Sequence, residues 1–257
     1  MATRLVHLLI DSADPLAAAT FWAQALGWLR LDESQQEAVA MPDFADQEAV
    51  VMPADFEYPG TSAVALDFVL VPEPKTVKNR VHLDLASTSL ADQAAQVERL
   101  VGLGATHVDV GQDDVPWVVL ADPEGNEFCV LDPRPLYRDT GPVAAIVVDC
   151  VDPVKMAGFW TLAAGWPVAG SDEEMVSLRS ASGEGPFVEM LRSGEPKQVK
   201  NRVHLDIAPF PGDDQAAEAA RLLAAGAKLA DVGQRGDESW IVMSDPEGQE
   251  FCLLTPR

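Results

Sequence analysis

The sequence has few cysteines, few basic residues and no long apolar run, and each shortage excludes a class of protein. Its three cysteines, Cys129, Cys150 and Cys252, are too few and too scattered for a disulfide framework. No apolar run approaches the roughly 18 residues that a membrane-spanning helix requires. Only 18 lysines and arginines stand against 41 aspartates and glutamates, and the resulting charge of −23 repels phosphate backbones and anionic lipid surfaces. We therefore expect neither nucleic acid nor a membrane as a partner.

The chain nevertheless has enough apolar material for a core. Hydrophobic residues make up 47% of its 257 residues, and this length allows one large domain or two modest ones. The N-terminal apolar stretch meets Asp11 without the small-residue cleavage site that is typical of a signal peptide. Together with the cysteine usage, this favours the cytoplasm as the location.

A long internal repeat settles the number of domains. Residues 75–86 read KTVKNRVHLDLA and residues 197–208 read KQVKNRVHLDIA, with 10 of 12 positions identical. Residues 117–131 and 240–254 match at 10 of 15 positions, and all six tryptophans fall into repeat pairs. A proline-containing segment, residues 132–142, separates the copies and suits a linker. We predict two domains, residues 1–135 and residues 142–257.

Each copy divides again into two similar halves. An apolar, strand-like run at 4–11 precedes Asp14, a good helix N-cap, and Pro15 at the first helical position. A second strand at 81–85 precedes a helix over about 90–101, and short strands separated by turn residues follow each helix. The order predicts two βαβββ modules in each domain and four in the chain, an α+β architecture.

These features resemble the vicinal oxygen chelate superfamily, which includes glyoxalase I, extradiol dioxygenases and bleomycin-binding proteins. The residues that carry the resemblance are His7 before Asp14-Pro15, the Phe21-Trp22 helix that ends at Gly27, Val81-His82-Leu83, and Asp122-Pro123-Glu124-Gly125. The motifs are those of its glyoxalase-like branch. The resemblance implies tandem domains, each of two modules whose mixed sheet curls around a cleft that holds a ligand or a metal. The sequence leaves open whether the modules pair within a domain or between the two domains.

The resemblance also implies which residues would hold a metal. Superfamily enzymes bind a divalent ion through side chains on the first and last strands of the modules. In the first copy these positions are His7, His82 and Cys129, with Asp67 at the remaining strand. A set of His7 and His82 with Asp67 or Cys129 would suit Zn, Fe, Mn or Ni. Because Cys129 replaces the usual carboxylate, we expect no metal, and a metal in the first domain remains the alternative.

The second copy departs further from this pattern. Ala145 stands where the first copy has His7, which leaves Glu189, His204 and Cys252 as the matching polar residues. Strand alternation puts His82 and Asp84 on one face and the apolar residues on the other, as it does again around His204. This face is predicted to line the pocket, with Trp117 and Trp240 as further wall residues. A histidine satisfied by its neighbouring aspartate is the structural alternative.

Two functions remain open at this point, beside a structural or interaction module whose clefts have lost all chemistry. The incomplete metal set favours binding of a small, largely apolar metabolite in the cleft. The alternative is an enzyme of the lyase, isomerase or dioxygenase type acting in the first domain, with a metal or with His82 as the general base. The first copy carries about 16 extra residues, and the acidic segment around them, at about 36–60, is expected to cover the first cleft. Since the duplication supplies a second domain, we expect a monomer to suffice, with a homodimer as the alternative.

Overall fold

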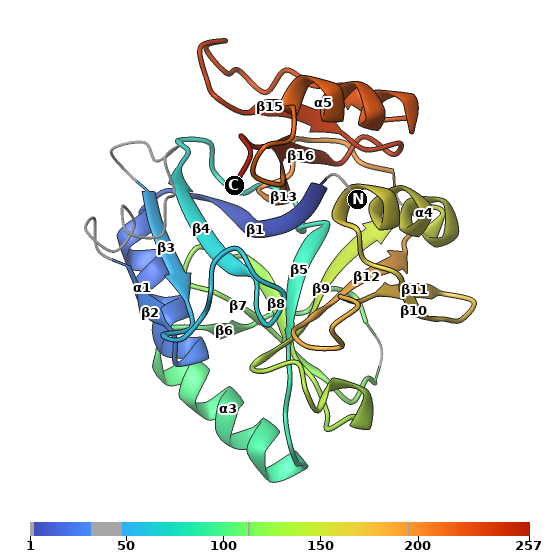
Figure 1. Cartoon of the computed structure of the whole chain (residues 1–257). Helices are drawn as coiled ribbons and strands as arrows, with labels where there is room; N and C mark the ends of the chain where they lie inside the picture. Colours follow the sequence, from blue (N-terminus) through green and yellow to red (C-terminus); the bar gives the residue numbers. More distant parts are fainter. Residues whose placement is uncertain (1–2, 32–47, 113, 195) are drawn as a thin grey trace.

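The computed structural model describes residues 3–31, 48–112, 114–194 and 196–257, and these form four βαβββ modules (Figure 1). The first module holds β1 (Thr3–Ser12), α1 (Pro15–Leu26), β2 (Leu29–Arg30), β3 (Glu48–Met52) and β4 (Ala65–Leu70). The second holds β5 (Val81–Leu85), α3 (Leu90–Gly102), β6 (Thr106–His107), β7 (Val118–Ala121) and β8 (Glu127–Val130). The predicted succession of strands and helices in the first repeat is thus confirmed.

The second repeat follows the same plan after a short 3₁₀ helix, η1 (Pro135–Tyr137). Its first module holds β9 (Val143–Cys150), α4 (Pro153–Ala164), β10 (Val168–Ser171), β11 (Met175–Leu178) and β12 (Phe187–Arg192). The last module holds β13 (Val203–Pro209), α5 (Gln215–Ala224), β14 (Lys228–Leu229), β15 (Ile241–Ser244) and β16 (Glu250–Leu253). Within the described ranges, no helix is long and apolar enough to span a membrane.

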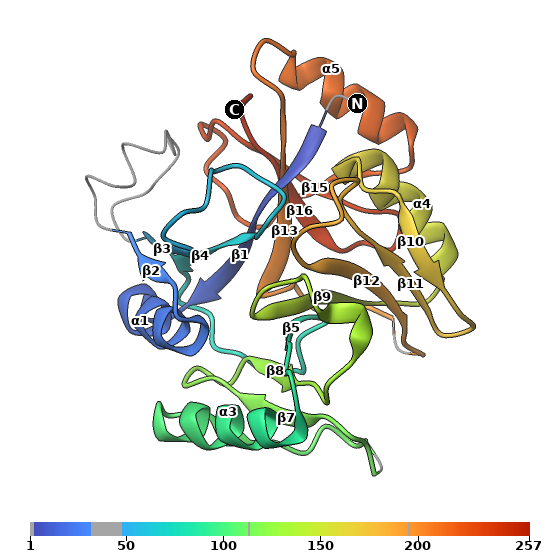
Figure 2. The same ribbon diagram turned by 60° about the horizontal axis from the view of Figure 1, so that its bottom comes forward.

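The two repeats exchange modules to build their sheets. The first sheet has the order β14-β15-β16-β13-β1-β4-β3-β2, so it joins the first module to the fourth. The second has the order β10-β11-β12-β9-β5-β8-β7-β6 and joins the second module to the third. Figure 2 shows β1 beside β13 and β5 beside β9, where antiparallel pairing joins the repeats. The sequence left this pairing open.

A β-bulge at each join fixes which side chains face each other. In β1 the register shifts between Leu5 and His7, which puts His7 directly opposite Asp206 on β13. The equivalent shift between β5 and β9 puts Ala145 opposite Asp84. A bulge adds one residue to one strand and re-aims the side chains next to it. The repeated bulge therefore sets two equivalent pairs of facing positions, one in each sheet.

Strand alternation separates the core from the site. Leu8 and Ile10 of β1, and Leu205 and Ile207 of β13, lie in the large apolar cluster between sheets and helices. The residues between them, such as His204 and Asp206, point to the other face of the sheet. Trp22 and Trp160 belong to the core, and each ring N–H donates to a buried aspartate, Asp122 at 3.1 Å and Asp245 at 3.3 Å.

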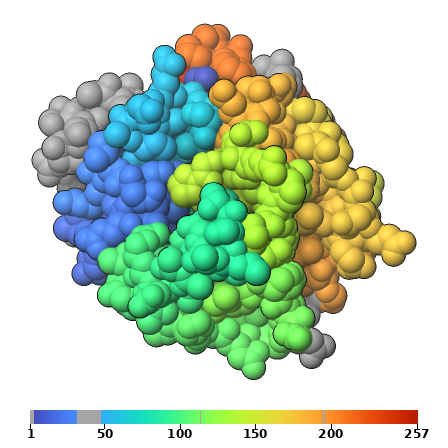
Figure 3. Space-filling view, turned by 90° about the horizontal axis from the view of Figure 1, so that it is seen from below, coloured from blue at the N-terminus to red at the C-terminus, as the bar shows by residue number. Residues whose placement is uncertain are grey.

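Helix contacts hold the two modules of each repeat together. Arg99 of α3 donates to the last carbonyl groups of α1, at Gln24 and Ala25. Arg221 of α5 makes the equivalent bond to Leu162 of α4. Seen from below, segments of the first repeat (blue and green) and of the second (yellow and orange) lie side by side on one surface (Figure 3). The repeats are therefore joined through the sheets, while each stays connected through its helices.

The loop between β11 and β12 gives a first test of this arrangement, at Gly185. A Cβ atom at this residue, where φ is +75°, would lie 2.0 Å from the carbonyl oxygen of Thr61 in the other repeat. We expect Gly185→Ala to lower the free energy of unfolding by about 2–4 kcal/mol, since left-handed strain and a backbone clash combine. Urea denaturation measures this loss.

Gly183 in the same loop supplies the matched control. Its φ of +73° is nearly the same, but nothing lies within 4 Å of an added Cβ atom. Gly183→Ala should therefore cost only the conformational strain, about 1 kcal/mol. Equal losses in the two variants would contradict the close approach of the repeats at Thr61.

Candidate functional site

Module exchange divides the predicted site residues between two places. We call the face of the first sheet opposite the core the first site; it carries His7, Asp67, His204, Trp240 and Cys252. The corresponding face of the second sheet is the second site; it carries His82, Trp117, Cys129 and Glu189. The structure thus does not bring His7 and His82 together. Because they lie in different sheets, His7 and His82 cannot form the predicted ligand set in one cleft. His7 instead shares the first site with His204 and Cys252.

A buried aspartate connects the two histidines of the first site. Asp206 Oδ2 lies 2.9 Å from His7 Nε2, and Asp206 Oδ1 lies 3.3 Å from His204 Nε2. The backbone N–H of Cys252 donates to the same Oδ1 at 3.1 Å, and the Cys252 thiol lies 3.5 Å from His204 Nε2. Asp206 is only 1% exposed. A carboxylate this deeply buried needs such partners to remain ionised.

The opposite charges of Asp206 and the two histidines stabilise one another. Burial alone would raise the pKa of Asp206, but the charges of His204 and His7 and the hydrogen bond from His7 hold that pKa below its usual value. Burial alone would lower the pKa of His7, but the hydrogen bond to Asp206 and the negative charges of Asp206 and Asp67 raise it. His7 and Asp206 therefore form a buried ion pair across the β1–β13 join.

Asp67 is the other acidic residue of the first site. Its Oδ2 lies 3.8 Å from His7 Nε2. Among the described residues its Oδ1 has no hydrogen-bond partner, although the side chain is almost fully buried. Burial raises the pKa of this carboxyl to about 6, against the opposing charge of His7. One oxygen of Asp67 is thus left available for a further hydrogen bond.

A cavity of about 810 Å³ adjoins this array. Its wall combines the histidines and acidic residues with apolar side chains, notably Leu9, Val69, Trp240, Val242 and Leu254. Lys200 and Arg235 also reach the wall. Ligand pockets commonly measure roughly 300–1,000 Å³ and combine apolar walls with a few polar groups. The first site therefore has the size and lining of a small-molecule pocket.

Two residues that the sequence did not single out complete the first site. The Tyr58 hydroxyl lies 3.3 Å from His7 Nδ1, on the side away from Asp206. Arg257 lines the cavity and hydrogen-bonds to Tyr58, which lowers the pKa of that hydroxyl against the larger effect of burial. Both nitrogens of His7 thus have partners. Tyr58 belongs to the predicted segment at 36–60. Residues 36–47 of that segment lie outside the described residues.

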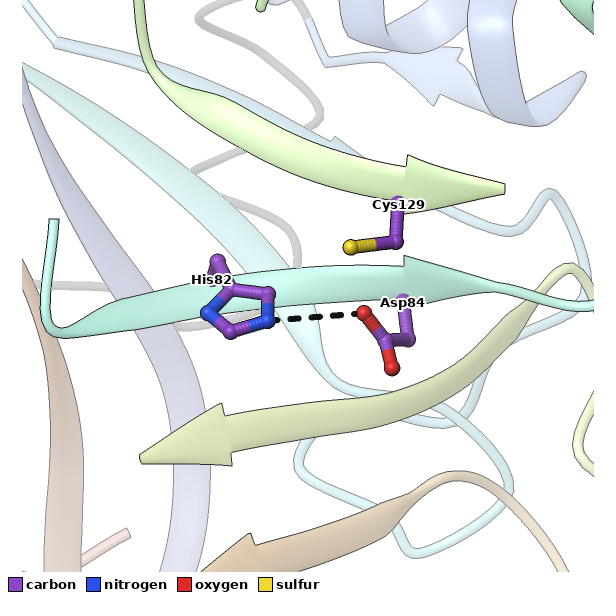
Figure 4. A group of neighbouring side chains, drawn as sticks. All are labelled: His82, Asp84 and Cys129. Atoms are coloured by element: carbon purple, nitrogen blue, oxygen red, sulfur yellow. Dashed lines mark ion pairs between the residues drawn. The ribbon is translucent and has the colours of Figure 1, made fainter. Parts of the chain in front are cut away.

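The second site has a trio of side chains, His82, Asp84 and Cys129, that corresponds to His204, Asp206 and Cys252 of the first site. No histidine faces this trio from the neighbouring strand. His82 Nε2 lies 3.6 Å from Asp84 Oδ1, and the Cys129 thiol points toward both (Figure 4). Because Ala145 faces Asp84, this carboxyl lacks the partner that His7 provides to Asp206. Burial raises the pKa of Asp84 to about 7 and lowers the pKa of His82 to about 4. Between about pH 4 and pH 7 the side chains of His82 and Asp84 are thus mainly neutral, whereas His7 and Asp206 in the first site are charged.

Tyr137 of η1 fills the second site from the linker. Its hydroxyl donates to Glu189 at 3.1 Å, and its ring meets Phe187 edge-on at 5.7 Å between centroids. Ser177 donates to the same Glu189 oxygen at 3.1 Å. Tyr137 packs in an apolar cluster with Cys129, Leu131 and Trp117. The linker therefore supplies an aromatic side chain that occupies this site.

Both trios contain side-chain atoms that can act as ligands of a divalent metal ion. The nitrogen, oxygen and sulfur ligand atoms of His204, Asp206 and Cys252 all lie within 4.8 Å of one another, as do those of the second trio. The separations of 3.3 and 3.5 Å around His204 match the spacing of about 3.3–3.6 Å between ligands on a tetrahedral zinc ion. The donor set of the first site thus fits a zinc-type ion.

The repeated Lys-Asn-Arg segments hold corners of the fold. Lys78 pairs with Asp149 at 2.8 Å, and Lys200 pairs with Asp11 at 2.6 Å, each across the join between repeats. Arg202 donates to the carbonyl oxygen of Asp11 at 2.7 Å. These contacts give the two segments a structural role at the joins between the repeats.

Asp206, Tyr58, Tyr137 and Arg257 were missing from the predicted site. For Asp206 a signal existed, because alternation puts it on the same face as His204. Arg257 repeats Arg134 after a proline, which is also visible in the sequence. Tyr58 and Tyr137 come from unrelated segments, so only the tertiary structure could place them.

Comparison with known proteins identifies the family. The sequence model of the glyoxalase-like domain matches residues 7–131 and 145–254. A search of curated protein sequences finds no significant match. Among solved structures, glyoxalase I from Zea mays superposes with a TM-score of 0.67 at 14% identity, over 99% of this chain and 92% of that one. A putative dioxygenase from Bacillus subtilis gives 0.61 at 14% identity, over 99% and 85%.

At this identity the structural matches show the fold alone, and it is the vicinal oxygen chelate fold that the motifs indicate. The family match covers nearly the whole chain in two copies, in agreement with the predicted tandem duplication. The chain belongs to the glyoxalase-like domain family.

Proposed function

We propose that this protein binds a small organic molecule in the first site. The observation that carries the proposal is the cavity of about 810 Å³ beside the His7–Asp206–His204 array. This cavity adjoins the first site, and for that reason we place the ligand there. The apolar wall around Trp240 would contact the body of the molecule, and the buried polar groups would orient it.

Fluorescence titration tests this proposal. A panel of small neutral metabolites should include a compound that quenches the intrinsic tryptophan emission of the wild type. Trp240→Phe should remove most of that quenching, because Trp240 lines the cavity. Trp117→Phe is the matched control, since Trp117 packs around Tyr137 in the second site, and it should leave the quenching intact. Quenching by no compound, or quenching lost only in Trp117→Phe, would overturn the proposal.

A metal-dependent enzyme is the second candidate, favoured by the spacing of His204, Asp206 and Cys252. These residues would hold the ion, which would supply a Lewis acid to a substrate oxygen. We rank this candidate second because Asp206 already pairs with His7. Metal analysis of the purified chain separates the two: stoichiometric metal that is lost in Cys252→Ser but kept in Cys129→Ser would favour the enzyme.

A further inference from the structure

A second hollow lies where the linker passes the two helices of the first repeat. It measures about 800 Å³, and its wall consists of the C-terminal end of α1, one face of α3, the end of β5 and residues 133–142. In the view from below, these segments, coloured blue, green and yellow-green, lie side by side (Figure 3). We call this hollow the linker groove. It shares no wall residue with the cavity of the first site.

The charge of the linker groove is opposite in sign to that of the whole chain. Its wall carries three arginines, Arg99, Arg134 and Arg138, and a single acidic residue, Asp92. The wall of the first-site cavity carries six acidic residues against three lysines and arginines. At physiological ionic strength, screening limits the effect of distant charges to about 8 Å. The arginines at hand therefore decide the potential in the groove, although the chain carries −23 in total.

Two of the three arginines lack a carboxylate partner within the described ranges. Arg134 pairs with Asp132 at 2.8 Å. Arg99 donates to the last carbonyl groups of α1 and forms no ion pair with a described residue. Arg138 is exposed, and its side chain has no hydrogen bond or ion pair to any described residue. Once Asp132 and Asp92 are set against the three arginines, one positive charge is left over.

The equivalent arginine of the second repeat is neutralised within the chain. Arg221 pairs with Glu218 at 2.6 Å and donates to the hydroxyl group of Thr3 at 2.7 Å. The first repeat has Gln96 in place of Glu218 and Gly141 in place of Thr3. Both Gln96 and Gly141 line the linker groove. These two replacements remove an internal anion and a side chain, and so leave charge and space in the groove.

A second pair of replacements removes bulk at the same place. In the second repeat, Arg4 lies over the ring of Phe210 at 4.6 Å. Their counterparts in the first repeat are Pro142 and Thr88, which line the groove. The wall also includes two further prolines and Tyr137. A pocket that combines apolar wall with a few charged groups suits a molecule with an apolar body and one charged end.

We propose that the linker groove binds a small organic carboxylate, whose negative charge is held by Arg99 and Arg138 and whose apolar body lies against the prolines. Guanidinium groups donate strong, charge-assisted hydrogen bonds to carboxylates. One surplus positive charge matches a single carboxylate better than a phosphate ester, which carries nearly two negative charges. The site is independent of the ligand proposed for the first site.

Two probes of nearly the same shape test the proposal on the full-length chain. 2-Naphthoate carries a carboxylate that is ionised at neutral pH, and 2-naphthamide is its neutral analogue. Calorimetric titration of the wild type should show at least about fivefold tighter binding of 2-naphthoate, since two partly exposed charge pairs form. Raising the ionic strength to about 1 M, where the Debye length is roughly 3 Å, should reduce this preference to less than about twofold.

The repeat supplies the most informative variant. Gln96→Glu gives Arg99 the partner that Glu218 gives Arg221, an arrangement that the second repeat already accommodates. It should reduce the preference for 2-naphthoate to less than about twofold, because the internal carboxylate competes for the arginine. An unchanged melting temperature shows that the variant is folded.

Two further variants complete the test. Arg138→Gln has no described contact to lose, so it should keep the fold and lower the affinity for 2-naphthoate at least about twofold. Lys155→Gln is the charge-matched control, because Lys155 is exposed on α4 and does not line the groove. It should leave the affinity for 2-naphthoate unchanged.

The outcomes distinguish the linker groove from the first site. Equal affinity of the wild type for the two probes would overturn the carboxylate. An affinity for 2-naphthoate that is undiminished in Gln96→Glu or in Arg138→Gln, or that falls equally in Lys155→Gln, would overturn the assignment to the groove. Trp240→Phe should leave the binding of 2-naphthoate intact, since Trp240 lines the other cavity. Loss of binding in that variant would place the carboxylate in the first site and refute the proposal.

Discussion

Replacing Asp206 by asparagine is expected to lower the free energy of unfolding by about 3–5 kcal/mol, the usual cost of breaking a buried ion pair. Asparagine fits the same space, but it removes the negative charge that faces His7 at 2.9 Å and His204 at 3.3 Å. If its oxygen keeps the hydrogen bond from Cys252 N–H, its amide group must face a histidine. Urea denaturation at pH 6 measures the loss.

The pH range over which Asp206→Asn destabilises the protein follows from the pKa shifts of Asp206 and His7. The pKa of Asp206 is lowered from its ordinary 3.8, so its contribution is complete above that value and is lost as the pH falls through the folded pKa. The pKa of His7 is raised from its ordinary 6.5, so its contribution is complete below that value and is lost as the pH rises through the folded pKa. The cost of Asp206→Asn should therefore be greatest between about pH 4 and 6.5.

Asp84→Asn is the matched control in the second site, and we expect it to raise the free energy of unfolding instead of lowering it. Ala145 replaces His7 there, and burial raises the pKa of Asp84 from 3.8 to about 7. A carboxyl whose pKa is raised on folding lowers the free energy of unfolding of the protein as the pH rises from the unfolded pKa to the folded pKa. Asp84→Asn should be more stable than the wild type by on the order of 2 kcal/mol at pH 8, a gain that develops between about pH 4 and 7. A similar loss in both variants would contradict the asymmetry between the sites.

Cutting the chain between Arg138 and Asp139 is expected to leave two halves that fold only together. Each sheet draws one module from each repeat, through the β1–β13 and β5–β9 pairs. A half alone would expose two unpaired strands with apolar side chains, which favours self-association. Coexpressed residues 1–138 and 139–257 should form a one-to-one complex the size of the intact chain.

Light scattering after size exclusion measures this result. Each half expressed alone should form dimers or aggregates, because a second copy can offer the missing module. The intact chain is the control for the size of the complex. A half that is a folded monomer, with the near-ultraviolet dichroism of packed aromatic residues, would mean that the modules of one repeat can pair with each other.

Several features of the site could be predicted from particular residues. Alternation in the two strands Val-His-Leu-Asp correctly indicated that His82 and His204 lie opposite the core face. The missing histidine at Ala145 indicated that the two sites differ, and the structure translates this difference into a charged array around Asp206 and a neutral trio around Asp84. The tyrosines were beyond prediction, because Tyr58 comes from the connection between β3 and β4 and Tyr137 from the linker, two unrelated segments.

The sequence by itself determined the duplication, the four βαβββ modules, the core face of each strand and the membership of the glyoxalase-like family. It could do so because strand and helix periods and repeated motifs are local properties. The tertiary structure alone decided which modules share a sheet. The strands at 81–85 and 203–207 are nearly identical, so β1 could pair with either by local preference. Only the packing of the whole chain brings His7 to Asp206, and puts Tyr58 beside the first site and Tyr137 in the second.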